Sequence, residues 1–269
     1  MNILTIDIGG TYIRSAIINS KLNILNLIKN KSSNNIIDDI VNHFNNQIKY
    51  SKKNNITLEN RMGISIGGCI DKLNGTILNV SKQNNKWISQ LGDISTKSIS
   101  SLNLKEELNK NIKNFDIYID NDGNCAAHSE KYFGNAINCN NFITIVLGTG
   151  VGIGVYINGQ IIQYAEIGDF IEDKCSGRYF DSFGKKITKE IYINGAKCLG
   201  KKISELIQLL NPEKVIFNGP LLNIGNFFIN NIKESIIKNT REFFLNKCEI
   251  IFSKLENQGL LGAYTLTKF

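Results

Sequence analysis

The sequence predicts an α/β protein built from two similar halves, and three observations support this prediction. The chain has 269 residues, which is enough for two domains of ordinary size. Strand-like and helix-like patterns alternate along it, as in folds that cover sheets with helices. Residues 2–21 (NILTIDIGGTYIRSAIINSK) also align without a gap with residues 141–160 (NFITIVLGTGVGIGVYINGQ), which indicates an internal repeat.

Each copy of the repeat predicts a β-hairpin with a glycine-rich bend, because β-branched residues dominate both arms. The bends consist of Gly9, Gly10 and Thr11 in the first copy and of Gly148, Thr149 and Gly150 in the second. Since glycine has no Cβ, the backbone amides of such a bend can approach phosphate oxygens closely. Two matching bends predict a site for a polyphosphate, held from both sides of a cleft between the halves.

The remaining elements follow in chain order from hydrophobic periodicity. The first half predicts a helix over 36–51, a strand over 62–66 and a helix over 104–112. The second half predicts, besides its hairpin, a strand over 116–119, helices over 124–132, 188–194 and 198–210, a strand over 215–217, a helix over 224–238, a strand over 250–252 and a closing helix from 259. The repeat spacing places the hinge near residue 115. We therefore expect lobes at 1–115 and 116–254, with residues 255–269 packing back on the first lobe.

Composition and charge exclude several classes of protein. A hydrophobic share of 42% and a charged share of 20% are typical of a globular chain. No apolar run reaches the roughly 18 residues of a membrane helix, and the start lacks the pattern of a secretory signal, so we expect a cytoplasmic protein with no membrane partner. The net charge of +7 comes mostly from scattered lysines, without the basic face of a nucleic-acid-binding protein. The six cysteines lack CxxC spacing, which argues against a zinc site or a redox pair.

Acidic residues near the bends are candidates for phosphoryl-transfer chemistry. Asp7 lies just before the first bend, with only Ile8 between them, and can hold the waters of a magnesium ion. Asp120 and Asp122 stand where a predicted strand enters a helix, so either can accept the proton of an attacking hydroxyl or cap the helix. Glu166 and Glu172 lie in a turn-rich stretch and are either acceptors for sugar hydroxyls or solvated surface residues.

The motifs together resemble those of the ROK family (repressor, open reading frame, kinase), in the superfamily of actin, hexokinase and heat-shock ATPases. DIGGTYIR at 7–14 is similar to the family's DxGGTxxR, and LGTGVGIG at 147–154 to its LGTGVGxG. GISIGGCIDKLNGTILNV at 63–80 resembles the segment GIGxPGxVDxxxGxxxN, and NDGNCAAHSEKYFG at 121–134 resembles NDANAAAxGExxxG. These matches cover both halves of the chain.

Two further matches lie near the C-terminus. LNPEKVIFNGPL at 210–221 resembles the motif on the adenosine side of the nucleotide, with its glycine turn at Gly219. ENQGLLGAYTL at 256–266 resembles the closing AGxxGAA helix of the family. The resemblance therefore extends over nearly the whole chain.

The resemblance implies a two-lobed actin-like ATPase fold, also called ribonuclease H-like, with duplicated α/β domains around a central cleft. It implies a glucokinase- or fructokinase-like enzyme that uses ATP and Mg²⁺ to phosphorylate a hydroxyl of a hexose, and a homodimer. Asp122 falls on the family's catalytic base and Asn121 on a neighbouring sugar contact. Glu166, Asp169 and Glu172 fall in the stretch that meets the sugar.

The sequence also departs from the family in that stretch. The family's ExGH reads EIGD here, so Glu166 is kept and Asp169 replaces the histidine. The zinc loop CxCGxxGC is missing, since only Phe170 and Ile171 separate Asp169 from Glu172. Glu172 opens the stretch EDKCSG, which matches the family's LExxxSG. We therefore expect no structural zinc.

Two other functions stay open at this stage. One is a catalytically weakened sugar-binding regulator, because the family includes repressors and Asp169 alters the usual sugar contact. The first strand begins at residue 2, which leaves no space for a preceding helix-turn-helix module and favours the kinase. The other is an actin-like ATPase that needs no sugar. The ND segment at 121–122 favours the kinase over this ATPase. The sequence does not identify the sugar.

Overall fold

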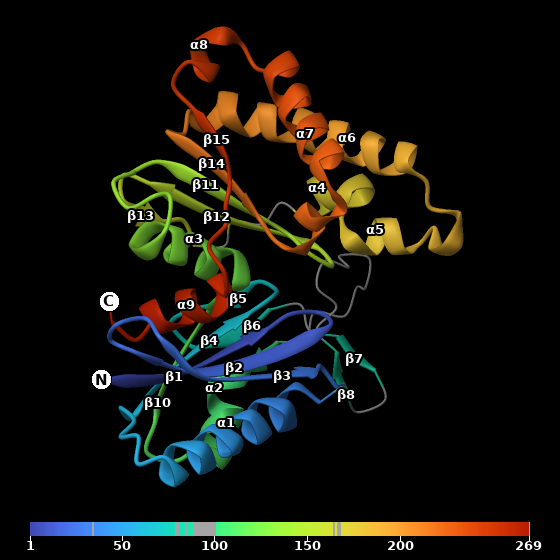
Figure 1. The fold of residues 1–269 in the computed structure, drawn as a ribbon. Coiled ribbons are helices and arrows are strands. Elements are labelled where there is room, and N and C mark those ends of the chain that lie inside the picture. The colour runs from blue at the N-terminus through green and yellow to red at the C-terminus, as the bar shows by residue number, and fades with distance from the viewer. Residues whose placement is uncertain are drawn as a thin grey trace. The chain divides into compact units, whose positions relative to one another are not determined.

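The computed structural model describes residues 1–33, 35–78, 81–83, 86–88, 101–163, 165 and 168–268, without the side chains of residues 81–83, 86–88, 168–170 and 173. It divides into two compact units, Met1–Ser129 with Glu256–Phe269 and Glu130–Leu255. Each unit contains a five-stranded sheet with helices packed on it (Figure 1). The chain is therefore an α/β protein with a duplicated architecture.

The sheet of the first unit joins an antiparallel meander to two parallel strands, in the order β10-β4-β1-β2-β3. Its strands are β1 (Asn2–Ile8), β2 (Tyr12–Asn19), β3 (Ile24–Lys31), β4 (Arg61–Ile66) and β10 (Asp116–Asn121). The first unit extends to Ser129, beyond the hinge expected near residue 115. The reason is that β10 pairs in parallel with β4 and so belongs to the first sheet.

The two faces of this sheet carry different helices, because side chains alternate along each strand. The helices that begin in this unit are α1 (Ile36–Lys53), α2 (Leu104–Asn111), α3 (Asp122–Phe133) and α9 (Gln258–Thr265). Ile6 and Ile8 of β1 point into a core shared with Ile40 of α1 and Leu104 of α2. The opposite face of β1 and β4 packs against α9, which keeps the end of the chain in the first unit.

Short strands follow β4 in two small sheets. They are β5 (Ile70–Asp71), β6 (Thr76–Ile77) and β9 (Leu102–Asn103) in one sheet, and β7 (Ser81–Gln83) and β8 (Lys86–Ile88) in the other. The sequence pattern did not predict these short strands. Two- and three-residue strands are too short for an alternating pattern to stand out.

The sheet of the second unit repeats the plan of the first, in the order β13-β12-β11-β14-β15. Its strands are β11 (Phe142–Leu147), β12 (Val151–Ile157), β13 (Gln160–Ile161), β14 (Lys214–Asn218) and β15 (Glu249–Phe252). An antiparallel meander is again followed by two parallel strands. Both predicted hairpins are therefore present, each as the first two strands of a sheet.

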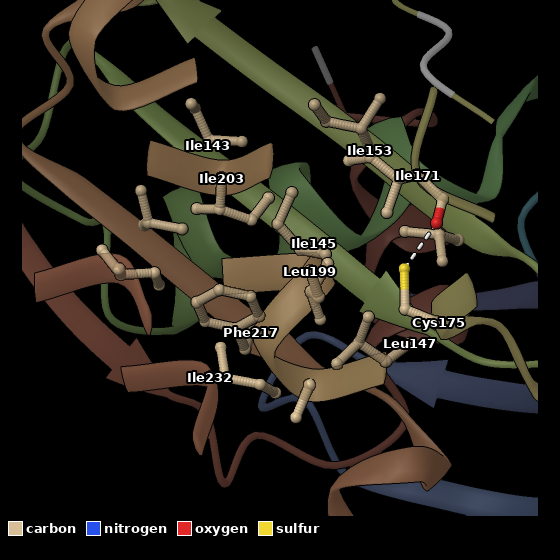
Figure 2. Close-up of a cluster of buried hydrophobic side chains, with 14 of the residues drawn as sticks. Ile143, Ile145, Leu147, Ile153, Ile171, Cys175, Leu199, Ile203, Phe217 and Ile232 are labelled. Atoms are coloured by element: carbon tan, nitrogen blue, oxygen red, sulfur yellow. Dashed lines mark hydrogen bonds between the residues drawn. The ribbon is translucent and has the colours of Figure 1, made fainter. Parts of the chain in front are cut away.

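Helices cover one face of the second sheet and close its core. They are α4 (Gly168–Cys175), α5 (Gly177–Asp181), α6 (Lys189–Leu210), α7 (Asn226–Asn239) and α8 (Glu242–Leu245), with 3₁₀ turns η1 (Gly184–Lys186) and η2 (Pro220–Ile224). Figure 2 shows Ile145 of β11 and Phe217 of β14 packed with Leu199 and Ile203 of α6. All four side chains have no exposed surface, so this layer forms the hydrophobic core of the unit.

One helix differs from its sequence prediction. The sequence predicts separate helices over 188–194 and 198–210, whereas α6 is continuous across both. Gly195 and Gly200 weaken the helical pattern, but they lie inside α6 because close packing requires them. A Cβ at Gly195 would come within 2.7 Å of the Phe180 ring.

The two bends also differ by one residue. Ile8 pairs with Ile13, so four residues form the first bend, whereas Leu147 pairs with Val151, so three residues form the second. The gapless alignment of the two sequences therefore does not carry over to strand pairing. A slip of one residue moves side chains to the opposite face.

Among the described helices, none combines the length and apolarity needed to cross a membrane.

Candidate functional site

The first glycine bend connects β1 to β2 and is exposed at Gly9, Gly10 and Thr11. Within the bend, the Gly9 amide donates to the Tyr12 carbonyl oxygen (2.9 Å). Ser32, just after β3, donates its amide to the Thr11 carbonyl (3.1 Å) and its hydroxyl to the Gly9 carbonyl (3.2 Å). Two carbonyl oxygens of the bend therefore accept hydrogen bonds from Ser32, and these bonds restrict the conformation of the bend.

Asp7, separated from the bend by Ile8, has contacts on three sides. Its Oδ2 accepts from Arg14 Nε (3.0 Å) and Nη2 (2.5 Å), and its Oδ1 accepts from Ser65 Oγ (2.8 Å). A Cβ at Gly259 of α9 would overlap the same carboxylate. Asp7 is 8% exposed, so the carboxylate is close-packed and has a fixed orientation.

This donor set fits a magnesium ion bound through water rather than directly. A carboxylate offers about four lone-pair positions, and Arg14 and Ser65 occupy three of those on Asp7. A carboxylate oxygen of Asp7 could accept one water of a hydrated Mg²⁺, which commonly keeps several waters in proteins. The outer-sphere role expected for Asp7 is compatible with these contacts.

Asp122 is the first residue of α3 and directly follows Asn121 at the end of β10. The Gly123 amide donates to Oδ1 of Asp122 (2.8 Å) and to Oδ1 of Asn121 (2.8 Å). Asn121 Nδ2 donates to the Gly68 carbonyl (2.7 Å). Both side chains therefore fix the entry to the helix, as Asx residues commonly do at helix starts.

The first bend and the start of α3 lie at the same edge of the first sheet. Ile8, Ile66 and Asn121 are in register across three parallel strands. Parallel strands leave a sheet at the same edge, so Gly9 and Asp122, which follow two of these residues, emerge there together. This edge of an α/β sheet is where ligands generally bind.

Asp120 lies behind this edge and is fully buried. Its Oδ1 accepts from the Asn121 amide (2.8 Å) and from Asn124 Nδ2 (2.9 Å). Its Oδ2 lies 3.4 Å from Lys72 Nζ and 3.7 Å from His128 Nε2. Burial alone would raise the pKa of Asp120, but the nearby His128 imidazole, the hydrogen bond from Asn124 and the charge of Lys72 outweigh burial and lower it.

We expect Asp120→Asn to lower the free energy of unfolding by about 2 kcal/mol near neutral pH, because it removes a buried, charge-assisted set of hydrogen bonds. A depressed folded-state pKa stabilises the protein above the ordinary pKa of aspartate, and this stabilisation is lost as pH falls through the folded-state value. The difference between Asp120→Asn and the unmodified protein should therefore shrink on acidification. Urea unfolding at several pH values measures it, with the exposed Asp116→Asn on the same strand as control. A difference independent of pH would contradict the account.

The second glycine bend connects β11 to β12 and is tied to the start of α5. The Gly148 amide donates to the Gly150 carbonyl (3.0 Å). The Gly177 amide donates to the Gly148 carbonyl (2.8 Å), and the Arg178 amide donates to the Thr149 carbonyl (2.9 Å). As in the first bend, a later segment of the same unit holds two carbonyls and fixes the shape of the bend.

Gly219 lies directly beside the second bend. It follows β14 with a positive φ of 103°, a conformation that favours glycine. A Cβ at this position would come within 2.7 Å of the Leu147 amide nitrogen. The second unit therefore brings Gly219 and the bend at 148–150 together, at the carboxyl ends of the parallel strands β11 and β14.

The acidic residues expected to meet a sugar are only partly described. Glu166 lies outside the described residues, and Asp169 is placed in α4 by its backbone alone. Glu172 lies on α4, and its Oε1 accepts the Val151 amide at 2.6 Å. Val151 is the first residue after the second bend, so Glu172 contacts the predicted phosphate site.

Each unit thus gathers its own set of the predicted residues. The sequence patterns alone indicate no role for Arg14, Ser65, Lys72 or His128. Their contacts join strands or turns that are distant in sequence. The pairing of Asp7 with Arg14 across the first hairpin is the one contact that strand register alone could have indicated.

The chain matches a family model described as ROK family over residues 3–170 and 171–269. By sequence, it is 25% identical over 268 residues to the xylose repressor of Bacillus subtilis, covering 84% of this chain and 65% of the repressor. It is 22% identical to the glucokinase of Thermotoga maritima, covering 77% and 78% of the two chains. The chain thus spans slightly less than two thirds of the repressor's length.

Among solved structures, the fold is similar to that of a ROK family glucokinase from Streptomyces griseus in complex with glucose and AMPPNP. The TM-score is 0.75 at 18% identity, with 100% of this chain and 99% of the other covered. Together with the duplicated sheets, this similarity confirms the predicted actin-like ATPase fold. The relatives include both sugar kinases and repressors.

Proposed function

Because the chain belongs to the ROK family, we propose that it is a kinase that transfers the γ-phosphate of ATP to a hydroxyl of a hexose. The observation that carries the proposal is the shared sheet edge of the first unit. There the exposed glycine bend and Asp122 follow parallel strands that are in register. A phosphate-binding bend and a carboxylate at one sheet edge are two of the features that phosphoryl transfer to an alcohol uses.

In this proposal Asp122 is the general base. It accepts the proton of the attacking sugar hydroxyl while the γ-phosphate transfers in line. Asn121 orients the turn through its bond to the Gly68 carbonyl, and the second hydrogen of its amide group can meet a sugar hydroxyl. Since Asp122 begins α3, its carboxylate has a fixed place relative to the backbone before substrate arrives.

The glycine bends supply the phosphate contacts. In each bend, two carbonyl oxygens accept hydrogen bonds from a later segment of the same unit. These bonds partly offset the partial negative charges of the two oxygens. The glycines leave no Cβ between the backbone amides and a phosphate group. Mg²⁺, held through water near Asp7, would supply positive charge that offsets the charge of the transferring group.

We assign hydrogen bonds with the sugar hydroxyls to Glu166, Asp169 and Glu172. All three are carboxylates and therefore only accept hydrogen bonds when ionised. Asp169 stands where the family has histidine, which can also donate. We therefore expect this chain to select hydroxyls that donate at that position.

A coupled ADP-release assay tests the proposal, with glucose, fructose, mannose and N-acetylated hexoses as acceptors. We expect ADP release to depend on one of these sugars. A rate that is equal with and without sugar would instead support a sugar-independent ATPase of the actin type. If the protein binds the nucleotide but releases no ADP in the presence of any of these sugars, the result would contradict kinase activity.

A second candidate function is a sugar-binding regulator. It is supported by the similarity to the Bacillus subtilis xylose repressor and by Asp169 in place of the family histidine. Isothermal titration calorimetry separates the two candidates. A regulator would bind a sugar, with xylose included in the panel, without releasing ADP.

A further inference from the structure

A carboxylate already accepts the backbone amide that directly follows the second glycine bend. Oε1 of Glu172 accepts the amide of Val151 at 2.6 Å, a length typical of a charge-assisted hydrogen bond. A Cβ at Gly150 would overlap that oxygen and lie 3.2 Å from the Glu172 Cδ. The carboxylate therefore packs directly against the bend, and the lack of a side chain at Gly150 makes this approach possible.

A carboxylate in this position competes with phosphate. Backbone amides of a glycine bend bind anions through their N–H groups, and the Val151 N–H is occupied by Glu172. A phosphate at residues 148–150 would also lie next to a group of like charge, which disfavours binding. We therefore expect Glu172 in this position to weaken phosphate binding at the bend.

The shape of the bend does not depend on Glu172 alone. Its side chain is partly exposed, and the bend keeps its shape through the separate backbone bonds from Gly177 and Arg178. In the proposed function Glu172 also accepts a sugar hydroxyl. A sugar that draws the carboxylate away would free the Val151 amide and remove the negative charge.

We propose that Glu172 is part of the nucleotide-phosphate site and makes nucleotide affinity depend on sugar. Without sugar its carboxylate occupies the bend, and with sugar it moves to the hydroxyl. The inference rests on the proposed function for the identity of the two ligands. Linkage then requires that nucleotide raises sugar affinity by the same factor.

The test measures the affinity of AMPPNP for the full chain without sugar, by isothermal titration calorimetry. Glu172→Gln keeps the size of the side chain and removes its charge. We expect it to bind AMPPNP about fivefold or more tightly than the unmodified protein, the lower end of typical coupling factors. Glu205→Gln, on the exposed face of α6, removes one charge elsewhere in the same unit and should leave the affinity unchanged.

Equal or weaker AMPPNP binding by Glu172→Gln would overturn the inference, and so would a failure of both proteins to bind. Circular dichroism and thermal unfolding establish that the variant is folded, and Glu172→Asp provides a second variant that keeps the charge but shortens its reach. It should give an intermediate affinity. This binding measurement needs no turnover, so its outcome is separate from that of the ADP-release assay. A protein that phosphorylates a sugar while Glu172→Gln leaves AMPPNP binding unchanged would keep the proposed function and refute the inference.

Discussion

Asp122→Asn is expected to lower the turnover number for sugar phosphorylation by about 10²- to 10⁴-fold, the usual contribution of a positioned general base. The KM for sugar should stay within about threefold, because an asparagine has the same size and removes an interaction needed in the transition state. Steady-state rates over a range of sugar and ATP concentrations measure both quantities. A variant that keeps turnover within about threefold of the unmodified enzyme would rule out Asp122 as the base.

The substitution is expected to keep the hydrogen bond of Asp122, which makes the result interpretable. Oδ1 of Asp122 accepts the Gly123 amide, and the oxygen of an asparagine can accept the same bond. Asparagine is also as good as aspartate at the start of a helix. Asp116→Asn, at the exposed far end of β10, is the matched control and should have turnover close to the unmodified value.

A large effect on stability is expected at Gly63 of β4. A Cβ at this position would overlap the backbone carbonyl of Ala263 in α9. Backbone cannot move aside as a flexible side chain can, so Gly63→Ala must shift α9 away from the sheet. We expect the free energy of unfolding to fall by about 3 kcal/mol or more, at the upper end for overpacking.

Urea unfolding of Gly63→Ala measures this loss, and Gly184→Asn is its control. Gly184 has a positive φ of 49° and no atom within 4 Å of an added Cβ. Asparagine tolerates that conformation, so the control should change stability much less. A Gly63→Ala protein as stable as the unmodified one would show that α9 does not pack against β4 as described.

Sequence reasoning predicted the glycine bends well because their chemistry is local. A run of β-branched residues, two or three glycines and a second such run encode a hairpin within twenty residues. The structure has both hairpins at the predicted places. The sequence also predicts helices α1 and α7 and strands β4 and β14, because each has a clear hydrophobic period of its own.

What the sequence could not predict depends on contacts between distant segments. The place of β10 in the first sheet follows from its pairing with β4, which repeat spacing does not contain. The bond between Glu172 and the Val151 amide joins a helix to a bend 21 residues away. Asp120, Lys72 and His128 come together only because α3 and a turn after β5 meet behind the sheet edge. Hydrophobic periodicity within one segment does not encode such contacts between distant segments.

The most direct test of the central claim is mass spectrometry of the sugar after incubation with the protein, ATP and Mg²⁺. The account predicts a product heavier by one phosphoryl group for at least one hexose in the panel, formed by the unmodified protein and nearly absent with Asp122→Asn. If every sugar is recovered unmodified while ATP is bound or consumed, the protein is not the sugar kinase proposed here.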